Sequence, residues 1–121
     1  EIVQVTSKRS PCERLKVGCL IVKDDRIISI GYNGMPSGGS NVCEENNVTK
    51  PEVLHAESNA ITKLAKSTQS SDGATMYITI SPCIDCAKLI IQSGIERVVY
   101  GELYRNKDGI NLLRKAGINV S

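Results

Sequence analysis

The stretch ATMYITISPCIDCAKLIIQSGIERVVY, residues 74–100, decides the fold that this sequence predicts. Its first part, Ala74–Ile80, is rich in β-branched residues and predicts a strand. Helical periodicity follows over Cys83–Ser93, and Glu96–Tyr100 predicts a second strand. Two strands joined by a crossover helix are parallel, so this stretch predicts a parallel pair within an α/β domain.

The ends of the helix predicted over Cys83–Ser93 carry residues that are common at helix termini. Ser81-Pro82 stands where an N-cap and a first turn are expected. Gly94 stands just past the other end, where glycine often ends a helix. We therefore expect Ser81 to cap this helix.

Upstream, two apolar runs of strand length flank a polar pair. Lys16–Lys23 and Arg26–Tyr32 lie on either side of Asp24-Asp25 and predict a β-hairpin. Glu1–Arg9 has the pattern of the end of an amphipathic helix, which Pro11 interrupts. The residues of this helix predicted to face the core are Ile2, Val5 and Thr6.

Beyond the hairpin, Asn33–Pro51 is rich in Gly, Ser and Asn and predicts a long loop, which in a compact domain is usually functional or disordered. Leu54–Lys66 predicts a helix, Asn106–Ala116 another helix and Ile118–Val120 a short last strand. This alternation predicts parallel strands with helices on both faces of the sheet. The core face predicted for the helix over 54–66 comprises Leu54, Ala60, Ile61, Leu64 and Ala65.

The composition describes one compact domain over residues 1–121. No apolar run approaches the ~20 residues that span a bilayer, so no membrane role is expected. A net charge of +2, four Tyr and no Phe or Trp provide neither the basic groove nor the stacking surfaces of a nucleic-acid binder. Five cysteines without a signal-peptide pattern predict a reducing, cytoplasmic location. Because the chain starts without a Met, we expect a short N-terminal stretch to precede it.

Two short motifs carry the chemistry: His-Ala-Glu from His55 and Pro-Cys-x-x-Cys from Pro82. His55, Cys83 and Cys86 provide three zinc ligands and leave a fourth position open, as in catalytic zinc sites. Cysteines at i and i+3 of a first helical turn point the same way, and the positive helix N-terminus favours their thiolates. Glu57 adds a carboxylate that can carry protons for a zinc-activated water.

A Cys-x-x-Cys pair alone has simpler interpretations. It is often half of a structural zinc site or a redox pair, and a pair that follows a strand and opens a helix also fits a thioredoxin-like role. These interpretations leave His55 and Glu57 without a function. The combined pattern resembles that of the zinc-dependent deaminases.

Within that superfamily, the chain resembles the deoxycytidylate (dCMP) deaminases over nearly its whole length. The resemblance implies hydrolytic deamination of dCMP to dUMP with release of ammonia, supplying dUMP for dTTP synthesis. In that reaction zinc-activated hydroxide attacks C4 and Glu57 shuttles the protons. It also implies the cytidine deaminase-like fold, a three-layer α/β/α sandwich with a five-stranded mixed sheet. The stretches that carry the resemblance are Val17–Val22, Gly31–Pro36, His55–Ile61, Ser81–Lys88 and Val99–Ile118.

Members of that family are commonly oligomeric, and many are activated by dCTP and inhibited by dTTP. The resemblance therefore implies a homo-oligomer, with a hexamer as the first expectation. It also implies a regulatory site for dCTP, which a Mg²⁺ ion accompanies. The loop over Ser37–Pro51 is short for a complete site of this kind.

The resemblance also implies substrate contacts. Asn33 should hydrogen-bond the deoxyribose, and the backbone N–H of Ala56 should meet the pyrimidine carbonyl. Asn59, Tyr104 and Arg105 are candidates for holding the sugar and the phosphate, for which the planar, always-charged Arg side chain is suited. Simpler roles stay open: a turn residue for Asn33, packing beneath the last helix for Tyr104 and a surface charge for Arg105.

Three cysteines remain outside the motifs. Cys19 lies within a predicted strand, where the family often has Ala, and is expected to be a small core residue. Some relatives bind a second, structural zinc through cysteines and a second histidine, but His55 is the only histidine of this chain. Cys12 and Cys43 are therefore expected to be buried or free thiols.

Competing functions remain. Turnover of dCTP, or of another cytosine nucleotide or nucleoside, would keep the chemistry and change the substrate. A tRNA adenosine deaminase would need a basic RNA-binding surface, and a riboflavin-pathway deaminase usually carries a reductase domain that 121 residues cannot hold. A non-catalytic, zinc-stabilised interaction module is the alternative from a different class, and it gives Glu57 no role.

Overall fold

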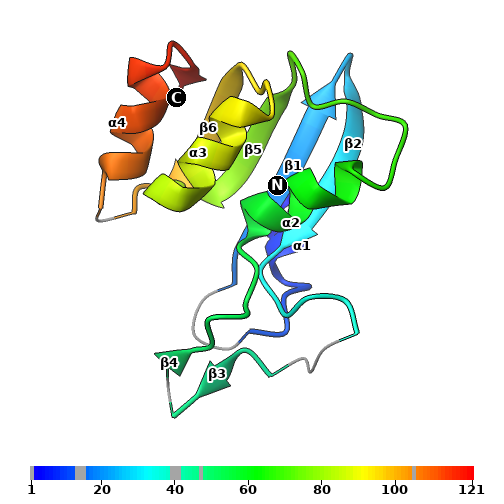
Figure 1. The fold of residues 1–121 in the computed structure, drawn as a ribbon, viewed down its shortest axis with the longest axis vertical. Helices are drawn as coiled ribbons and strands as arrows, with labels where there is room; N and C mark the ends of the chain where they lie inside the picture. Colours follow the sequence, from blue (N-terminus) through cyan, green and yellow to red (C-terminus); the bar gives the residue numbers. More distant parts are fainter. Residues whose placement is uncertain (1, 13–15, 39–41, 47, 105) are drawn as a thin grey trace.

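The computed structural model describes residues 2–12, 16–38, 42–46, 48–104 and 106–121. These residues form a mixed sheet of five strands in the order β2-β1-β5-β6-β7, together with four helices (Figure 1). The sheet strands are β1 (Gly18–Lys23), β2 (Arg26–Tyr32), β5 (Thr75–Ile80), β6 (Arg97–Glu102) and β7 (Asn119–Val120). The helices are α1 (Ile2–Ser7), α2 (Ala56–Leu64), α3 (Ile84–Gln92) and α4 (Asp108–Lys115). The predicted α/β class with a five-stranded mixed sheet is confirmed.

The strand pairing follows the sequence prediction. Strands β1 and β2 form an antiparallel hairpin, and the turn residues Asp24 and Asp25 both have positive φ angles, 52° and 60°. Such a turn matches the right-handed twist of the strands that it joins. Strand β1 also pairs with β5, antiparallel, whereas β5 pairs with β6 and β6 with β7 in parallel. The hairpin and the parallel pair are therefore both confirmed.

Helices cover both faces of the sheet. On one face, α1 packs so closely on β1 that a Cβ atom at Gly18 would lie 2.5 Å from the backbone nitrogen of Ser7. The next residue, Cys19, points to the opposite face, where it shares the main core with Ala60 of α2. Helices α2, α3 and α4 lie side by side along the sheet (Figure 1). None of the helices in the described part of the chain has the length and apolarity needed to cross a bilayer.

The core face predicted for the N-terminal helix is only partly correct. Thr6 is buried, but Ile2 and Val5 are 59% and 63% exposed. The backbone of α1 lies against Gly18, and this approach turns the face with Ile2 and Val5 away from the sheet. The hydrophobic pattern of so short a helix did not identify the face that packs.

The second helix is shorter than predicted. Ala60 and Leu64 are buried and Ile61 packs against the core, as expected. Leu54 precedes the helix and forms an isolated β-bridge with Gly34 instead. Ala65 is exposed, which contradicts the prediction, because α2 ends at Leu64 and the chain turns there.

The predicted long loop contains a small hairpin that the sequence did not indicate. Strands β3 (Glu44–Glu45) and β4 (Val48–Thr49) pair with each other, away from the main sheet (Figure 1). Cys43 precedes this hairpin and forms a disulfide with Cys12, across 31 residues of chain. Both cysteines are buried, as expected, but the expectation of free thiols is wrong because the loop folds back and brings them together.

Gly31 fixes the distance between β2 and α2. A Cβ atom there would lie 2.7 Å from the backbone nitrogen of Ala60, well inside contact distance. We expect Gly31→Ala to lower the free energy of unfolding by about 1–3 kcal/mol, measured by urea denaturation, because α2 must move. Gly34→Ala, whose Cβ would meet Pro11 at an ordinary 3.4 Å, is the matched control and should cost clearly less. Equal stability of the two variants would contradict this account of the packing.

Candidate active site

The N-termini of α2 and α3 bring together the residues of the two motifs. His55 is the N-cap of α2 and Cys83 the N-cap of α3, both with extended backbones, and Cys86 lies in the first turn of α3. The cap of α3 therefore differs from the prediction, which gave this place to Ser81. Ser81 remains paired with the sheet, since its backbone N–H donates to the carbonyl of Glu102 at 2.8 Å.

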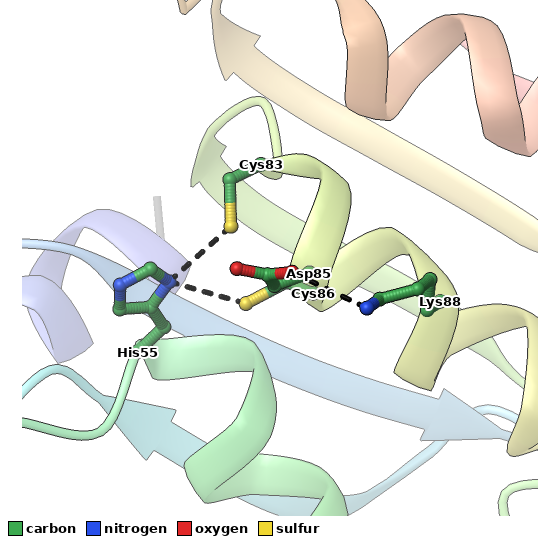
Figure 2. Close-up of polar contacts among 5 residues, drawn as sticks. All are labelled: His55, Cys83, Asp85, Cys86 and Lys88. Carbon is green, nitrogen blue, oxygen red and sulfur yellow. Dashed lines mark hydrogen bonds and ion pairs between the residues drawn. The ribbon is translucent and has the colours of Figure 1, made fainter.

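The three predicted zinc ligands point toward one another (Figure 2). The Nδ1 atom of His55 lies 3.2 Å from the Sγ atom of Cys86 and 3.5 Å from that of Cys83. In a tetrahedral zinc site, ordinary Zn–N and Zn–S bond lengths separate a nitrogen and a sulfur ligand by about 3.5 Å. One imidazole and two thiols at these distances therefore fit zinc without rearrangement. Asp85, between the two cysteines, pairs instead with Lys88 at the surface.

The protonation of the ligand cluster favours metal binding. Hydrogen bonds from Cys86 and His55 lower the pKa of Cys83 to about 4, so that this thiol is a thiolate at neutral pH. The hydrogen bond to Cys83 raises the pKa of His55. The hydrogen bond between Cys83 and Cys86 raises the pKa of Cys86, and burial raises it further. One thiolate thus already exists without a metal, and an ion would replace the protons that the three side chains share.

Glu57 is a buried carboxyl group in the first turn of α2. Its side chain is only 4% exposed, and burial raises its pKa to about 7. Cys19 of β1 lies in the core beneath it, and its own pKa is raised by burial and by the charge of Glu57. A carboxyl group with a pKa near neutrality can both accept and donate a proton, which is the property that proton transfer requires.

The site opens into a cavity of about 490 Å³. The predicted site residues that line it are Asn33, His55, Ala56, Glu57, Cys83 and Tyr104. Cys86 lies just beneath, 3% exposed, with its sulfur against His55. The volume is in the range of small-molecule sites.

Asn33 is held in place by Val17. Its Oδ1 atom accepts a hydrogen bond from the backbone N–H of Val17 at 2.8 Å, and its own N–H donates to the Val17 carbonyl at 3.2 Å. The Ser10 hydroxyl donates to the Asn33 carbonyl at 2.7 Å. The side chain therefore stabilises the loop and borders the cavity at the same time.

One predicted substrate contact, Asn59, lies elsewhere, and another cannot be placed. Asn59 lines a second cavity of about 250 Å³ and donates through Nδ2 to the carbonyl of Tyr32. Arg105 lies outside the described residues. In the second cavity, the side-chain cations of Arg9 and Lys63 lie over the Tyr32 ring, 5.5 and 5.4 Å from its centroid.

Sequence reasoning missed several residues of the first cavity. They come from four segments of the chain: Cys12, Val17, Glu44, Thr49, Val53, Ile80 and Ser81. Of these residues, only Ser81 could have been suspected from the sequence, because it directly precedes the Pro-Cys-x-x-Cys motif. The sulfur atoms of Cys12 and Cys43 and the carboxylate of Glu44 form a second close group. As a disulfide, these sulfurs are not available as metal ligands.

The comparisons with known proteins agree with this geometry. Residues 1–102 match the family described as the cytidine and deoxycytidylate deaminase zinc-binding region. The chain belongs to this family and is a hydrolytic deaminase. Its His55, Cys83 and Cys86 form a group that could hold the zinc ion.

Individual relatives are more specific. The deoxycytidylate deaminase of enterobacteria phage T4 is 39% identical over 164 residues, covering 99% of this chain and 85% of the phage protein. The crystal structure of dCMP deaminase from the cyanophage S-TIM5, in complex with dCMP and dUMP, has a TM-score of 0.97 and 45% identity over 99% of this chain and 90% of that one. A riboflavin-pathway deaminase/reductase from Thermotoga maritima is 30% identical with a TM-score of 0.76, but this chain covers only 33% of it.

Removal of one ligand should abolish metal binding. We expect Cys83→Ser and Cys86→Ser to reduce bound zinc from about one ion per chain to near zero after dialysis, measured by atomic emission, because two protein ligands do not hold zinc tightly. Cys19→Ala, which removes a buried free thiol of β1, is the control and should keep its zinc. Retention of zinc by the ligand variants would contradict the assignment.

Proposed function

We propose that the chain catalyses the hydrolytic deamination of dCMP to dUMP. The observation that carries this proposal is the buried Glu57 in the wall of a nucleotide-sized cavity, beside a three-ligand metal set. A purely structural zinc site needs neither the cavity nor the carboxyl group. The names of the relatives at 39% and 45% identity supply the substrate, dCMP.

Each part of the site has a role in this reaction. Zinc, held by His55, Cys83 and Cys86, would lower the pKa of a bound water from about 15.7 toward 7. As the water attacks C4, Glu57 would take its first proton and deliver it to the ring nitrogen. Glu57 would then take the second proton from the hydroxyl group at C4 and deliver it to the amine, which leaves as ammonia when the C4–N bond breaks. Burial, which raises the pKa of Glu57 to about 7, suits a group that must accept and release a proton in the same cycle.

The substrate contacts follow from the walls of the cavity. We propose that Asn33 binds the deoxyribose and that the N–H of Ala56, the first residue of α2, binds the pyrimidine carbonyl. The first N–H groups of a helix have no partner within it, so they are available to a ligand. Tyr104 would lie against the nucleotide and Arg105 would bind its phosphate. Asn59, which lines the second cavity and donates to the carbonyl of Tyr32 at the end of β2, would support the nucleotide site only indirectly.

Substitution of Glu57 distinguishes its role in catalysis from a role in metal binding. We expect Glu57→Ala to keep its zinc and to lose ~10²–10⁴-fold in turnover, because the proton carrier is gone. The assay is ammonia release from dCMP, dCTP, deoxycytidine and CMP by the zinc-loaded protein. Preferential turnover of dCMP by the wild type supports the proposal. Preference for another substrate would leave the deamination reaction in place and overturn dCMP as the substrate. Loss of zinc in the variant would contradict the role of Glu57.

We further propose that the second cavity binds a regulatory nucleotide triphosphate, dCTP with Mg²⁺ as activator or dTTP as inhibitor. Arg9, Lys63 and Asn59 line this cavity, and two cations around one hollow favour an anionic ligand. Desolvation and the charge of Arg9 lower the pKa of Lys63, so that a phosphate would relieve repulsion between the two cations.

Regulation can be tested without touching the first cavity. We expect Lys63→Ala to keep the basal rate with dCMP and to shift half-maximal activation to about tenfold higher dCTP, since one phosphate contact is lost. Lys66→Ala, an exposed cation one turn further on, is the control and should respond like the wild type. A wild-type rate that ignores both dCTP and dTTP would overturn this part of the proposal.

We also propose that the chain forms a homo-oligomer, with six copies as the first expectation, and that it acts in the cytoplasm. Exposed apolar residues on two helices support self-association: Ile2, Val5, Ile84 and Leu89. Cys83 and Cys86 are free thiols that must stay reduced to bind zinc, which supports the location, whereas the Cys12–Cys43 disulfide is of a kind that is rare there.

A further inference from the structure

The Ser81 side chain lies between the metal-ligand turn and the segment that carries Tyr104. Ser81 is 3% exposed, and its Oγ atom accepts a hydrogen bond from the backbone N–H of Tyr104 at 2.6 Å. Its own backbone N–H donates to the carbonyl of Glu102 at 2.8 Å. One residue thus holds the chain on both sides of Leu103, just beyond the end of β6.

The far end of the same segment is held by the neighbours of Ser81. Gly109, in the first turn of α4, packs against the backbone of Pro82 and Cys83 so closely that a Cβ atom would lie 2.8 Å from the Cys83 carbonyl oxygen. The chain between β6 and α4 is therefore fastened at both ends to residues 81–83. Tyr104, which Ser81 holds, borders the first cavity.

Among the contacts described above between residues 81–83 and this segment, only the bond from Tyr104 uses a side-chain group, the Ser81 hydroxyl. The contact with Glu102 is made by the backbone and would survive any exchange of the side chain, and so would the packing at Gly109. The bond from Tyr104, by contrast, depends on the Oγ atom alone. Ser81 also lines the cavity, so the bond lies at the edge of the space where a nucleotide would bind.

We propose that Ser81 is a positioning residue. Its hydroxyl fixes the backbone of Tyr104, and so the place of the Tyr104 side chain, and this sets the nucleotide affinity of the site. It acts through Tyr104 and leaves the metal ligands and Glu57 in place. The inference rests on the proposed function, because it assigns Tyr104 to the nucleotide. Neighbouring residues of one motif thus have two different roles: Cys83 and Cys86 bind the metal, and Ser81 holds Tyr104 at the wall of the cavity.

Removal of the hydroxyl should affect binding more than chemistry. In Ser81→Ala the Tyr104 N–H loses its acceptor, and the segment must shift to bring this group to water. We expect the KM for dCMP to rise about tenfold, with kcat within threefold of the wild type and zinc content unchanged. Ser81→Thr keeps the acceptor and should stay within threefold in KM.

Ser29→Ala is the matched control. Ser29 is also buried, and its hydroxyl donates to the carbonyl of Ala60 at 2.6 Å, so a bond of the same length is lost outside the residues that line the cavity. Its KM should remain that of the wild type. An equal rise in KM for Ser29→Ala and Ser81→Ala would mean that the effect is general destabilisation, and it would overturn the inference.

A double-mutant cycle provides the decisive test. If Ser81 acts through Tyr104, the variant with both Ser81→Ala and Tyr104→Ala should have the KM of Tyr104→Ala alone. Amide hydrogen exchange at residue 104 should be faster in Ser81→Ala than in the wild type or in Ser29→Ala, and this readout does not depend on turnover.

The outcomes are distinguishable. A double variant whose KM rises by the product of the two single effects would overturn the role of Ser81, and so would a loss of zinc or an equal loss in Ser81→Ala and Ser81→Thr. Faster exchange at residue 104 with an unchanged KM would also overturn it. Failure of the wild type to release ammonia from any cytosine nucleotide would overturn the proposed function first, and the substrate role of Tyr104 with it.

Discussion

The antiparallel pairing of β1 with β5 is the constraint on which the rest of this structure depends. It joins a half made of α1, the β1–β2 hairpin and α2 to a half made of alternating strands and helices. With Cys19 opposite Ile78, the starts of α2 and α3 lie at the same edge of the sheet. A slip of one residue would turn the Cys19 side chain out of the core that it shares with α2. The pairing of two strands therefore determines whether one imidazole and two thiols can meet.

Those features that local sequence determines could be predicted. The hairpin followed from two apolar runs around Asp24-Asp25, and the parallel pair from a strand, a helix and a strand within residues 74–100. The ligand set followed from motifs in which each spacing lies within a single turn. The prediction that Cys19 is a core residue was correct as well, because a small apolar residue within an apolar strand is usually buried. In each case, the pattern that allows the prediction lies within one or two short stretches of the chain, even where the contacts themselves join distant residues.

The features that long-range contacts determine could not be predicted from the sequence. Ser81 has the residue type of a helix N-cap, yet its hydroxyl bonds a backbone N–H 23 residues away, and local sequence cannot weigh these two partners. Ile2 and Val5 fit an apolar stripe, but the missing side chain of Gly18 decided which side of α1 lies on the sheet. The disulfide and the β3–β4 hairpin depend on the path of a long loop, which has no periodicity from which to read it.

The separation of the metal ligands along the chain has a consequence for the life of the protein in a cell. His55 and Cys83 lie 28 residues apart, so an ion between them closes a loop that contains α2 and β5. An ion that binds only the folded chain adds stability in proportion to the logarithm of its free concentration, about 1.4 kcal/mol for each tenfold change. The abundance of this domain would then follow zinc supply as well as gene expression. Copies made during a shortage would be the first to meet proteases.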